Sequence, residues 1–249
     1  MVHNNKEVLA YRNEKKVQSM YDKYLINLEI QLITSKIPPK SKILDAGCGE
    51  GEGTLVYSKI PKTVIHAVDF SNTRLRLAKK KLKGIKNVIF KQADFLNNYN
   101  LDNDYDIIIS QRFLINLMKW NLQKKVLRDL LKMLRSGGKI ILLEGCIDGV
   151  RELNKFRSLF GLEPIPVKWH NLFFDNKKLV KFMSNSGAKL IDEDGLGEYF
   201  LLTRGVRPVF DNKLNWDTKF NQMSAGLRLK NLMKLKSRFS RLKLWVFEK

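Results

Sequence analysis

A glycine-rich turn in the stretch "ILDAGCGEG" holds the first residues of this sequence whose types and spacing could do chemistry. Gly47, Gly49 and Gly51 alternate with other residues directly after a short apolar run. Because glycine has no Cβ, a ligand can come close to the backbone of such a turn. Asp45 stands just before the turn, where a carboxylate would repel a pyrophosphate but would suit a cationic group such as an α-ammonium.

Two more carboxylates follow apolar runs farther along the chain. Asp69 ends "TVIHAVD", and an acid at this position can accept hydrogen bonds from both hydroxyls of a ribose. Asp94 is followed by Phe95, and a carboxylate beside an aromatic ring suits the exocyclic amine and the flat ring of a purine. A ligand with an amino-acid end, a ribose and an adenine, but no phosphate, is S-adenosylmethionine.

These residues need a fold that brings the ends of several strands together. Short apolar runs alternate with helical patterns as far as Glu144. This alternation predicts an α/β protein with a parallel, doubly wound sheet, in which ligands bind beyond the carboxyl ends of the strands. The expected strands are 42–46, 63–69, 87–93, 105–110 and 139–144, and the expected helices are 5–36, 54–59, 71–83 and 119–134.

The alternation of strand and helix stops after Glu144. Two helical insertions are expected, at 148–175 after the fifth strand and at 195–241 between the sixth and the last strand. A helix at 176–186 and a sixth strand beginning at 188–192 separate them. The last strand is expected either at 243–248, in "LKLWVFEK", or at 199–204, in "YFLLTR".

The chain is strongly basic, with 46 Lys and Arg against 25 Asp and Glu and a formal net charge of +21. Such a charge would attract the phosphates of nucleic acids, nucleotide-sugars or anionic lipids, but lysines spread along the whole chain also fit a general solvated surface. The two cysteines form no CxxC pair, which predicts neither a zinc site nor a disulfide and fits a reducing cytosol. No transmembrane run or secretory signal is readable, so a cytoplasmic protein is expected.

Five stretches resemble the class I S-adenosylmethionine-dependent methyltransferases in order and spacing. They are "ILDAGCGEG", "VDF" at 68–70, "ADF" at 93–95, "YDIIISQ" at 105–111 and "LLKMLRSGGKIILLE" at 130–144. The resemblance implies a Rossmann-like sheet of seven strands, the last one antiparallel, with S-adenosylmethionine as cofactor. It also implies an N-terminal helical segment at 1–38 that covers the cofactor site and a methyltransferase domain at 39–249.

The resemblance assigns roles in the cofactor site by position. The glycine turn would lie under the methionine part, with Asp45 near its ammonium group. Asp69 and the neighbouring Phe70 would lie at the ribose, and Gln111 near the methyl donor. Asp94 and Phe95 would hold the adenine.

Motifs that are absent from the sequence exclude some classes of methyl acceptor. No Asn/Asp-Pro-Pro-Tyr/Phe motif of DNA amine methylation follows the fourth expected strand, where "SQRF" stands instead. Neither cysteine lies in a Pro-Cys motif, and no Asp-rich set of the metal-dependent catechol type is evident. A metal-free transfer is therefore expected, which needs mainly alignment and, for a hydroxyl acceptor, a base.

Polar side chains gather at the strand ends and in the insertions, where an acceptor would lie. His170 and Glu144 are the candidate bases, although a single His or a buried acid is often structural. Arg112 could bind an anionic group or belong to a helix surface, and Asn154 and Arg157 share one helix face that could equally be solvated. The candidate acceptor residues are Arg112, Asn116, Asn154, Arg157, Trp169, Asn171, Tyr199 and Arg204.

Two longer stretches, "QRFLINLMKWNLQKKVLRDLLKMLRSGG" and "LNKFRSLFGLEPIPVKWHNLFF", look more loosely like a bacterial subgroup linked with polysaccharide and modified-sugar biosynthesis. That resemblance implies a sugar, glycan or related polar metabolite as the acceptor and methylation at a hydroxyl as the reaction. The alternative is an RNA or protein methyltransferase that uses the basic helix at 71–86 and the basic tail "RLKNLMKLKSRFSRLK". The same tail could instead touch an anionic membrane surface.

Overall fold

The computed structural model describes residues 22–97, 99–211, 213, 215–230 and 233–249. Of the helix expected at 5–36, it contains α2 (Lys23–Thr34), which begins after Asp22, whose carboxylate accepts a hydrogen bond from the Leu25 backbone N–H at 3.1 Å. Residues 1–21 lie outside the described part, so the cover that 1–38 would form over the cofactor stays a prediction.

Seven strands form one sheet in the order β3-β2-β1-β4-β5-β7-β6. The expected number of strands and the expected antiparallel last strand are confirmed. All neighbours from β3 to β5 pair in parallel, and β7 runs antiparallel to both β5 and β6. The strands are β1 (Lys42–Ala46), β2 (Val64–Asp69), β3 (Val88–Gln92), β4 (Tyr105–Gln111), β5 (Leu134–Gly145), β6 (Lys189–Gly195) and β7 (Leu242–Glu248). The carboxyl ends of β1, β2 and β4 therefore meet at one edge, where the candidate cofactor residues stand.

The last strand is the one in "LKLWVFEK", whereas 199–204 is helical. β7 is buried along almost its whole length between two neighbouring strands, and its residues Leu242 to Glu248 are mainly apolar. Tyr199 and Arg204 instead both donate hydrogen bonds to the carboxylate of Asp22, the residue that precedes α2. The fifth strand also begins earlier than expected, at Leu134, because the turn "RSGG" pairs with the end of the chain through Gly137 and Gly138.

Four helices of the regular alternation flank the sheet: α3 (Glu52–Tyr57), α4 (Asn72–Lys81), α5 (Trp120–Met133) and α7 (Asn176–Asn185). Ser71 begins α4 as expected, with its hydroxyl accepting from the Arg74 backbone N–H, and Gly84 follows the helix with a φ of 88°. Asp175 begins α7 in the same way, through the backbone N–H of Lys178.

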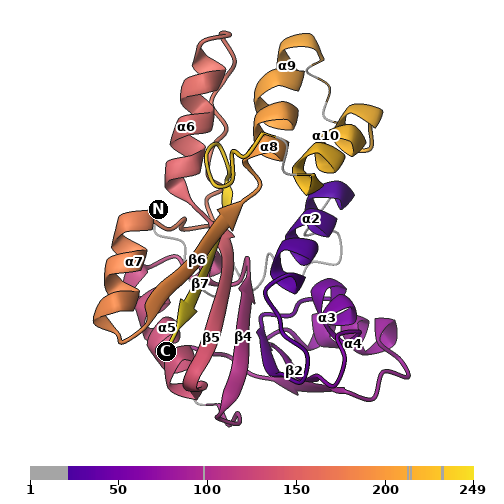
Figure 1. Cartoon of the computed structure of the whole chain (residues 1–249), viewed down its shortest axis with the longest axis vertical. Coiled ribbons are helices and arrows are strands. Elements are labelled where there is room, and N and C mark those ends of the chain that lie inside the picture. Colours follow the sequence, from indigo (N-terminus) through magenta and orange to yellow (C-terminus); the bar gives the residue numbers. More distant parts are fainter. Residues whose placement is uncertain (1–21, 98, 212, 214, 231–232) are drawn as a thin grey trace.

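The two insertions rise together beyond the carboxyl end of the sheet (Figure 1). The first begins with α6 (Ile147–Ser158) and continues as an extended segment to Phe174. The second contains α8 (Gly197–Phe200), the π-helical turn η2 (Leu201–Val206), α9 (Arg207–Phe210) and α10 (Lys219–Leu229). Helix α2 lies beside the second insertion, so three separate parts of the chain enclose the space above the strand ends.

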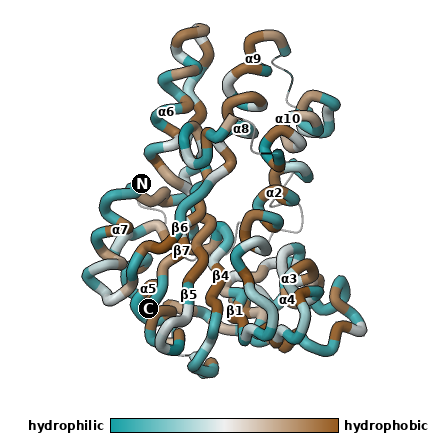
Figure 2. Tube along the Cα trace, viewed as in Figure 1, coloured by the Kyte–Doolittle hydropathy of each residue, from teal (hydrophilic) through white to brown (hydrophobic). Residues whose placement is uncertain are grey.

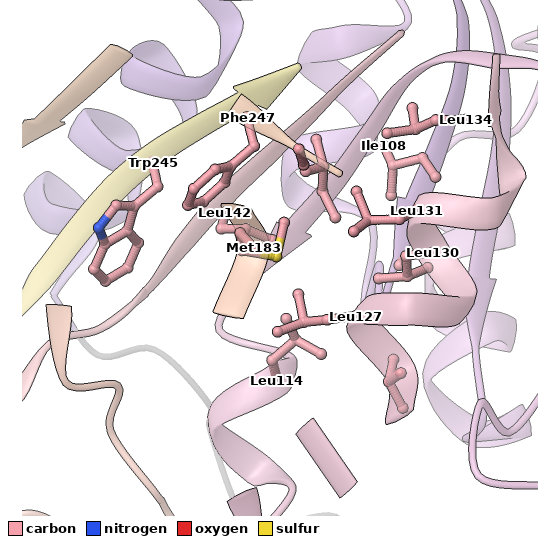
Figure 3. Close-up of a cluster of buried hydrophobic side chains, with 14 of the residues drawn as sticks. Ile108, Leu114, Leu127, Leu130, Leu131, Leu134, Leu142, Met183, Trp245 and Phe247 are labelled. Atoms are coloured by element: carbon pink, nitrogen blue, oxygen red, sulfur yellow. The ribbon is translucent and has the colours of Figure 1, made fainter. Parts of the chain in front are cut away.

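Apolar side chains fill both faces of the sheet. Figure 2 shows the apolar residues that run along its central strands. Alternate residues of β4 divide between the two faces, with Ile108 on one face and Ile107 and Ile109 on the other. Figure 3 shows the first face, where leucines of α5 and Met183 of α7 pack on Leu142, Trp245 and other residues of the strands. No helix in the described part of the chain is both long and apolar enough to cross a membrane.

Candidate cofactor and acceptor site

The glycine turn between β1 and α3 holds its three glycines in the left-handed region, with φ of 78° at Gly47, 58° at Gly49 and 80° at Gly51. A Cβ at Gly47 would lie 2.6 Å from Phe113, and one at Gly51 would lie 2.8 Å from Leu82. A Cβ at Gly49 would meet no atom within 4 Å. Packing therefore requires the first and third glycines, whereas the second faces open space that a ligand can occupy.

Two buried carboxylates lie next to this turn. Asp45 accepts a hydrogen bond from the Thr54 hydroxyl at 2.6 Å. Asp69 accepts from the backbone N–H groups of Gly49 and Ser71, both at 2.9 Å. Burial raises the pKa of Asp45 to about 6, the Thr54 hydrogen bond opposes this, and the negative charge of Asp69 adds to it.

This arrangement fits the amino-acid end of S-adenosylmethionine. A cationic ammonium group would find negative charge at Asp45 and bare backbone at Gly49. The contact of Asp69 with the ribose stays a prediction. When bound, the cofactor supplies a methyl group on a good leaving group. The chain's own part is to hold and orient it.

The residues expected at the adenine lie in less open surroundings. Asp94 accepts hydrogen bonds from the Leu96 backbone N–H at 2.9 Å and from the Asn97 side chain at 2.7 Å. The ring of Phe95 is buried in the core, 5.3 Å from that of Phe113. Phe70 is partly buried, with its carbonyl accepting a hydrogen bond from the Gln92 side chain at 3.0 Å. These side chains shape the turns after β2 and β3, and their contact with adenine stays a prediction.

The end of β4 is tied to helix α2 by a carboxylate that the sequence reasoning missed. Gln111 donates a hydrogen bond to Glu29 at 2.9 Å, and Arg112 forms an ion pair with the same carboxylate. Burial raises the pKa of Glu29, while Arg112 and Gln111 lower it. Arg112 has a φ of 51°, a strained backbone conformation for a residue with a side chain, held here by these contacts. The hydroxyl of Tyr57 donates to Gln111 at 3.3 Å.

Glu144, one of the two candidate bases, is fully enclosed. Its carboxylate accepts hydrogen bonds from Ser110 at 2.6 Å and from three successive backbone N–H groups at 2.9–3.2 Å, those of Phe113, Leu114 and Ile115. Burial raises its pKa to about 7, against the effect of these four donors. Glu144 does not line the acceptor cavity described below, so the geometry favours a structural role over the expected role as a base.

A cavity of about 640 Å³ lies between α2, the end of β4 and the two insertions. Seven cationic side chains line it against three carboxylates, an excess of four positive charges. The cations are Arg112, Arg157, Lys168, Arg204, Arg207, Lys213 and Arg241, and the acids are Asp22, Glu163 and Asp211. Aromatic and apolar residues such as Phe173 and Trp216 form the rest of its wall. The cavity thus combines positive charge with apolar surface.

Three of the cavity arginines are held by nearby groups. Arg204 donates to Asp22 at 2.5 Å and stacks on Trp216, and Arg207 pairs with Asp211 at 3.0 Å. Arg112 is held by Glu29 as described above.

Arg241, by contrast, has no carboxylate within ion-pair distance among the described residues; it donates to the Pro166 carbonyl at 3.2 Å. Burial first, and then Arg204 and Arg112, lower the pKa of Arg241 to about 10. An anion bound in the cavity would relieve the repulsion between Arg241 and the other two arginines.

The structure brings together most of the residues expected to bind the acceptor. Five of the predicted residues line the cavity, namely Arg112, Arg157, Arg204, Asn171 and the candidate base His170. Asn116 accepts a hydrogen bond from Asn171 at 3.0 Å, and the ring of Trp169 lies edge-on to that of His170 at 5.2 Å.

Two expected acceptor residues lie elsewhere. Asn154 exchanges two hydrogen bonds with the backbone of Ile165, which holds the insertion loop rather than a ligand. Tyr199 is buried and donates to Asp22 at 2.8 Å, so it joins α8 to α2. The polar groups of both residues form hydrogen bonds within the protein. The pattern of polar residues in the sequence does not distinguish such residues from residues that bind a ligand.

Sequence reasoning missed Asp22, Glu29, Trp216 and Arg241. Glu29 carried a signal, since it is an acid within the apolar stripe of "YLINLEIQLI". Trp216 and Arg241 carried none, because they reach the cavity from the middle and from the end of the second insertion. No group of three or more His, Cys, Asp or Glu side chains that could hold a metal occurs within the part of the chain that is described.

Comparisons with known proteins find relatives among methyltransferases. Demethylmenaquinone methyltransferase of Staphylococcus carnosus is 25% identical over 164 residues, 65% of this chain and 66% of that protein. Phosphoethanolamine N-methyltransferase of Triticum aestivum is 22% identical over 203 residues, 76% of this chain and 40% of that protein. The chain thus spans less than two thirds of the length of these two relatives.

Solved structures agree on the fold. A TehB-like SAM-dependent methyltransferase from Corynebacterium glutamicum has a TM-score of 0.56 at 17% identity, over 99% of this chain and 100% of that chain. A family model described as a methyltransferase domain matches residues 37–185, more than half of the chain. From its glycine turn, its sheet order and this match, the chain belongs to the class I S-adenosylmethionine-dependent methyltransferase family.

Proposed function

We propose that this protein transfers a methyl group from S-adenosylmethionine to a hydroxyl of a polar, negatively charged small molecule, with a sugar or glycan that carries a phosphate or carboxylate as the favoured class. The observation that carries this proposal is the cavity beside the glycine turn, with its excess of positive charge. Arg112 lines it directly after β4, next to Gln111 of the cofactor edge.

The charge of the cavity favours an acceptor with an anionic group. Arg241, Arg157 and Lys168 have no carboxylate within ion-pair distance among the residues described, and burial lowers the pKa of Arg157 as well as that of Arg241. Arginine forks match carboxylate and phosphate geometry. The wheat relative is named for an acceptor with a phosphate, and the staphylococcal one for a quinone, so relatives of this chain differ in acceptor.

His170 is the base that fits this reaction best. It lines the cavity and is buried there, whereas Glu144 is occupied by four hydrogen-bond donors in the core. In the transfer, the acceptor oxygen forms a bond to the methyl carbon while the carbon–sulfur bond breaks, and the hydroxyl proton passes to His170. The cavity residues supply alignment and exclude water.

The test is methyl transfer from radiolabelled S-adenosylmethionine to a panel of sugar phosphates, uronic acids, nucleotide-sugars, neutral sugars and RNA. We expect label in anionic small molecules, on an oxygen when the product is analysed by mass spectrometry. Label in RNA or protein would support the alternative class, and label in neutral sugars would remove the role of the cationic cavity.

A pair of charge variants sharpens the test. Arg241→Gln should raise KM for the anionic acceptor about tenfold or more, because a charge-assisted hydrogen bond contributes about 1.5–3 kcal/mol. Lys80→Gln removes one charge from the exposed side of α4 and should leave KM unchanged. Equal effects of the two variants would show that only the net charge of the chain matters.

A further inference from the structure

Helix α10 turns apolar side chains outward. Phe220, Met223 and Leu227 follow one another at helical spacing and are exposed, Met223 by 61%. A helix of a globular protein normally buries such a stripe against the core. The outer face of α10 is therefore an apolar surface with no counterpart among the described residues.

The inner face of α10 is polar. Asn221, Ser224 and Arg228 have the same helical spacing and are buried. Arg228 donates to the Gly195 carbonyl and to the Asp194 carboxylate, both at 2.8 Å. Because these bonds orient the helix, α10 cannot rotate its apolar stripe inward without leaving buried charges unpaired.

The tips of two neighbouring elements carry further exposed apolar residues. Leu159 and Phe160 follow α6, with Leu159 exposed by 79%, and Val209 and Phe210 end α9, with Phe210 exposed by 85%. Figure 1 shows the tips of α6 and α9 at the same end of the molecule, with α10 beside α9, and Figure 2 shows apolar residues at the outer end of α9. We name these four residues, together with the three of α10, the apolar tip.

The apolar tip frames the acceptor cavity. Residues in and next to α6 and α9 line the cavity. They are Arg157 and Leu162 on the α6 side, and Pro208 and Asp211 on the α9 side. The apolar residues next to them in sequence point to solvent. A surface that contacts the tip would therefore lie at the cavity.

The insertion that carries α9 and α10 also exposes basic residues. Six exposed cations of the second insertion have no carboxylate within ion-pair distance in the described ranges. They are Lys213, Lys219, Lys230, Lys234, Lys236 and Arg238. Apolar side chains beside basic ones match a bilayer with anionic headgroups, because the first enter the acyl boundary and the second meet the lipid charge.

We propose that the apolar tip docks on the surface of an anionic lipid bilayer, with the exposed basic residues of the second insertion on the headgroups and the acceptor cavity at the membrane interface. A second copy of this chain is a poorer occupant, since two faces of the same strong positive charge repel each other. Nucleic acid would use the charge but would leave the exposed Phe210, Met223 and Leu159 without a partner.

The test is flotation of the full chain with vesicles of phosphatidylglycerol and, separately, of phosphatidylcholine. We expect binding to the anionic vesicles alone, weakened by added salt. The double variant Phe210→Ser/Met223→Ser should lower this affinity about tenfold or more, since each change removes a large apolar side chain from the contact.

The matched control is Leu77→Ser, which removes an exposed apolar residue of α4, far from the tip, and should leave vesicle binding unchanged. Both variants should keep the affinity for S-adenosylmethionine and the circular dichroism spectrum of the parent. A failure of the membrane proposal can therefore be distinguished from a failure of the proposed activity.

Three results would overturn the proposal. The first is equal binding to both kinds of vesicle, and the second is unchanged binding by the double variant, which would leave charge as the sole cause. The third is a dimer, seen by sedimentation, that the double variant breaks while vesicles remain unbound. Salt-sensitive binding of RNA without binding of vesicles would assign the basic surface to nucleic acid instead.

Discussion

Glu29 of α2 and Arg112 beyond β4 form an ion pair at the boundary between the glycine turn and the acceptor cavity. Glu29 is wholly buried, and Gln111 donates to the same carboxylate. This pair joins the N-terminal helix to the strand end that separates the two ligands of the proposed reaction. The position of α2 and the orientation of Arg112 therefore depend on each other.

Replacing Glu29 by Gln should lower the free energy of unfolding by about 2 kcal/mol, because Arg112 loses its charged partner while it stays half-buried. Urea denaturation measures this change. The control is Glu52→Gln, which breaks the exposed ion pair with Lys81 and should cost less than about 1 kcal/mol. Equal losses in the two variants would show that the Glu29 pair has no structural importance.

Gly49→Ala should weaken binding of S-adenosylmethionine about tenfold or more, because the new methyl group enters the open space above the turn. Gly84→Ala is a close control, since Gly84 also has positive φ and open space at its Cβ position but lies after α4. Both variants should lose about 1 kcal/mol of stability from left-handed strain. Calorimetry that finds the same affinity in both would contradict the assignment of the turn to the cofactor.

The stability of the protein should fall as the pH rises from about 4.5 to about 7, because burial raises the pKa of Glu144 to about 7. In this window the unfolded chain releases the Glu144 proton more readily than the folded chain, so the folded state loses relative stability. The difference of the two pKa values corresponds to about 3 kcal/mol. Asp45, with its pKa raised to about 6, adds a loss of the same sign.

Urea denaturation across this pH window tests the contribution of Glu144. In Glu144→Gln the slope with pH should be smaller than in the parent, whatever the change in absolute stability from the altered hydrogen bonds to Ser110 and the 113–115 turn. An unchanged slope would show that Glu144 does not titrate between the folded and unfolded states.

His170→Gln should lower the rate of methyl transfer to the anionic acceptor about 100-fold to 10,000-fold, which is the range for loss of a general base. The affinity for S-adenosylmethionine should not change, because His170 lines the acceptor cavity and not the glycine turn. A variant that keeps the parent's rate would exclude His170 as the base.

Local patterns were enough to predict the sheet and the glycine turn. The strands are short apolar runs, Ser71 begins α4 as expected, and the antiparallel last strand is one of the two runs that the sequence offered. The choice between those two runs was not local. Residues 199–204 have enough apolar character for a strand, and only the contacts of Tyr199 and Arg204 with Asp22 account for their helical form.

The acceptor site likewise contains residues that local patterns could predict and residues that they could not. Arg112, His170 and Arg204 could be proposed from the sequence because polar residues at strand ends and in insertions are unusual enough to be noticed. Asn154 looked equally promising but holds the backbone of Ile165. Arg241 went unnoticed, because one arginine among many in a basic tail carries no distinguishing signal.

The sequence by itself determined the class of fold, the family and the cofactor edge, because these depend on residue spacing within short segments. The tertiary structure alone decided which charges meet. Glu29 and Arg112 are 83 residues apart, and Asp22 and Arg204 are 182 residues apart. Pairs at such separations are set by how three parts of the chain pack above the sheet, and so is the positive charge of the cavity that they enclose.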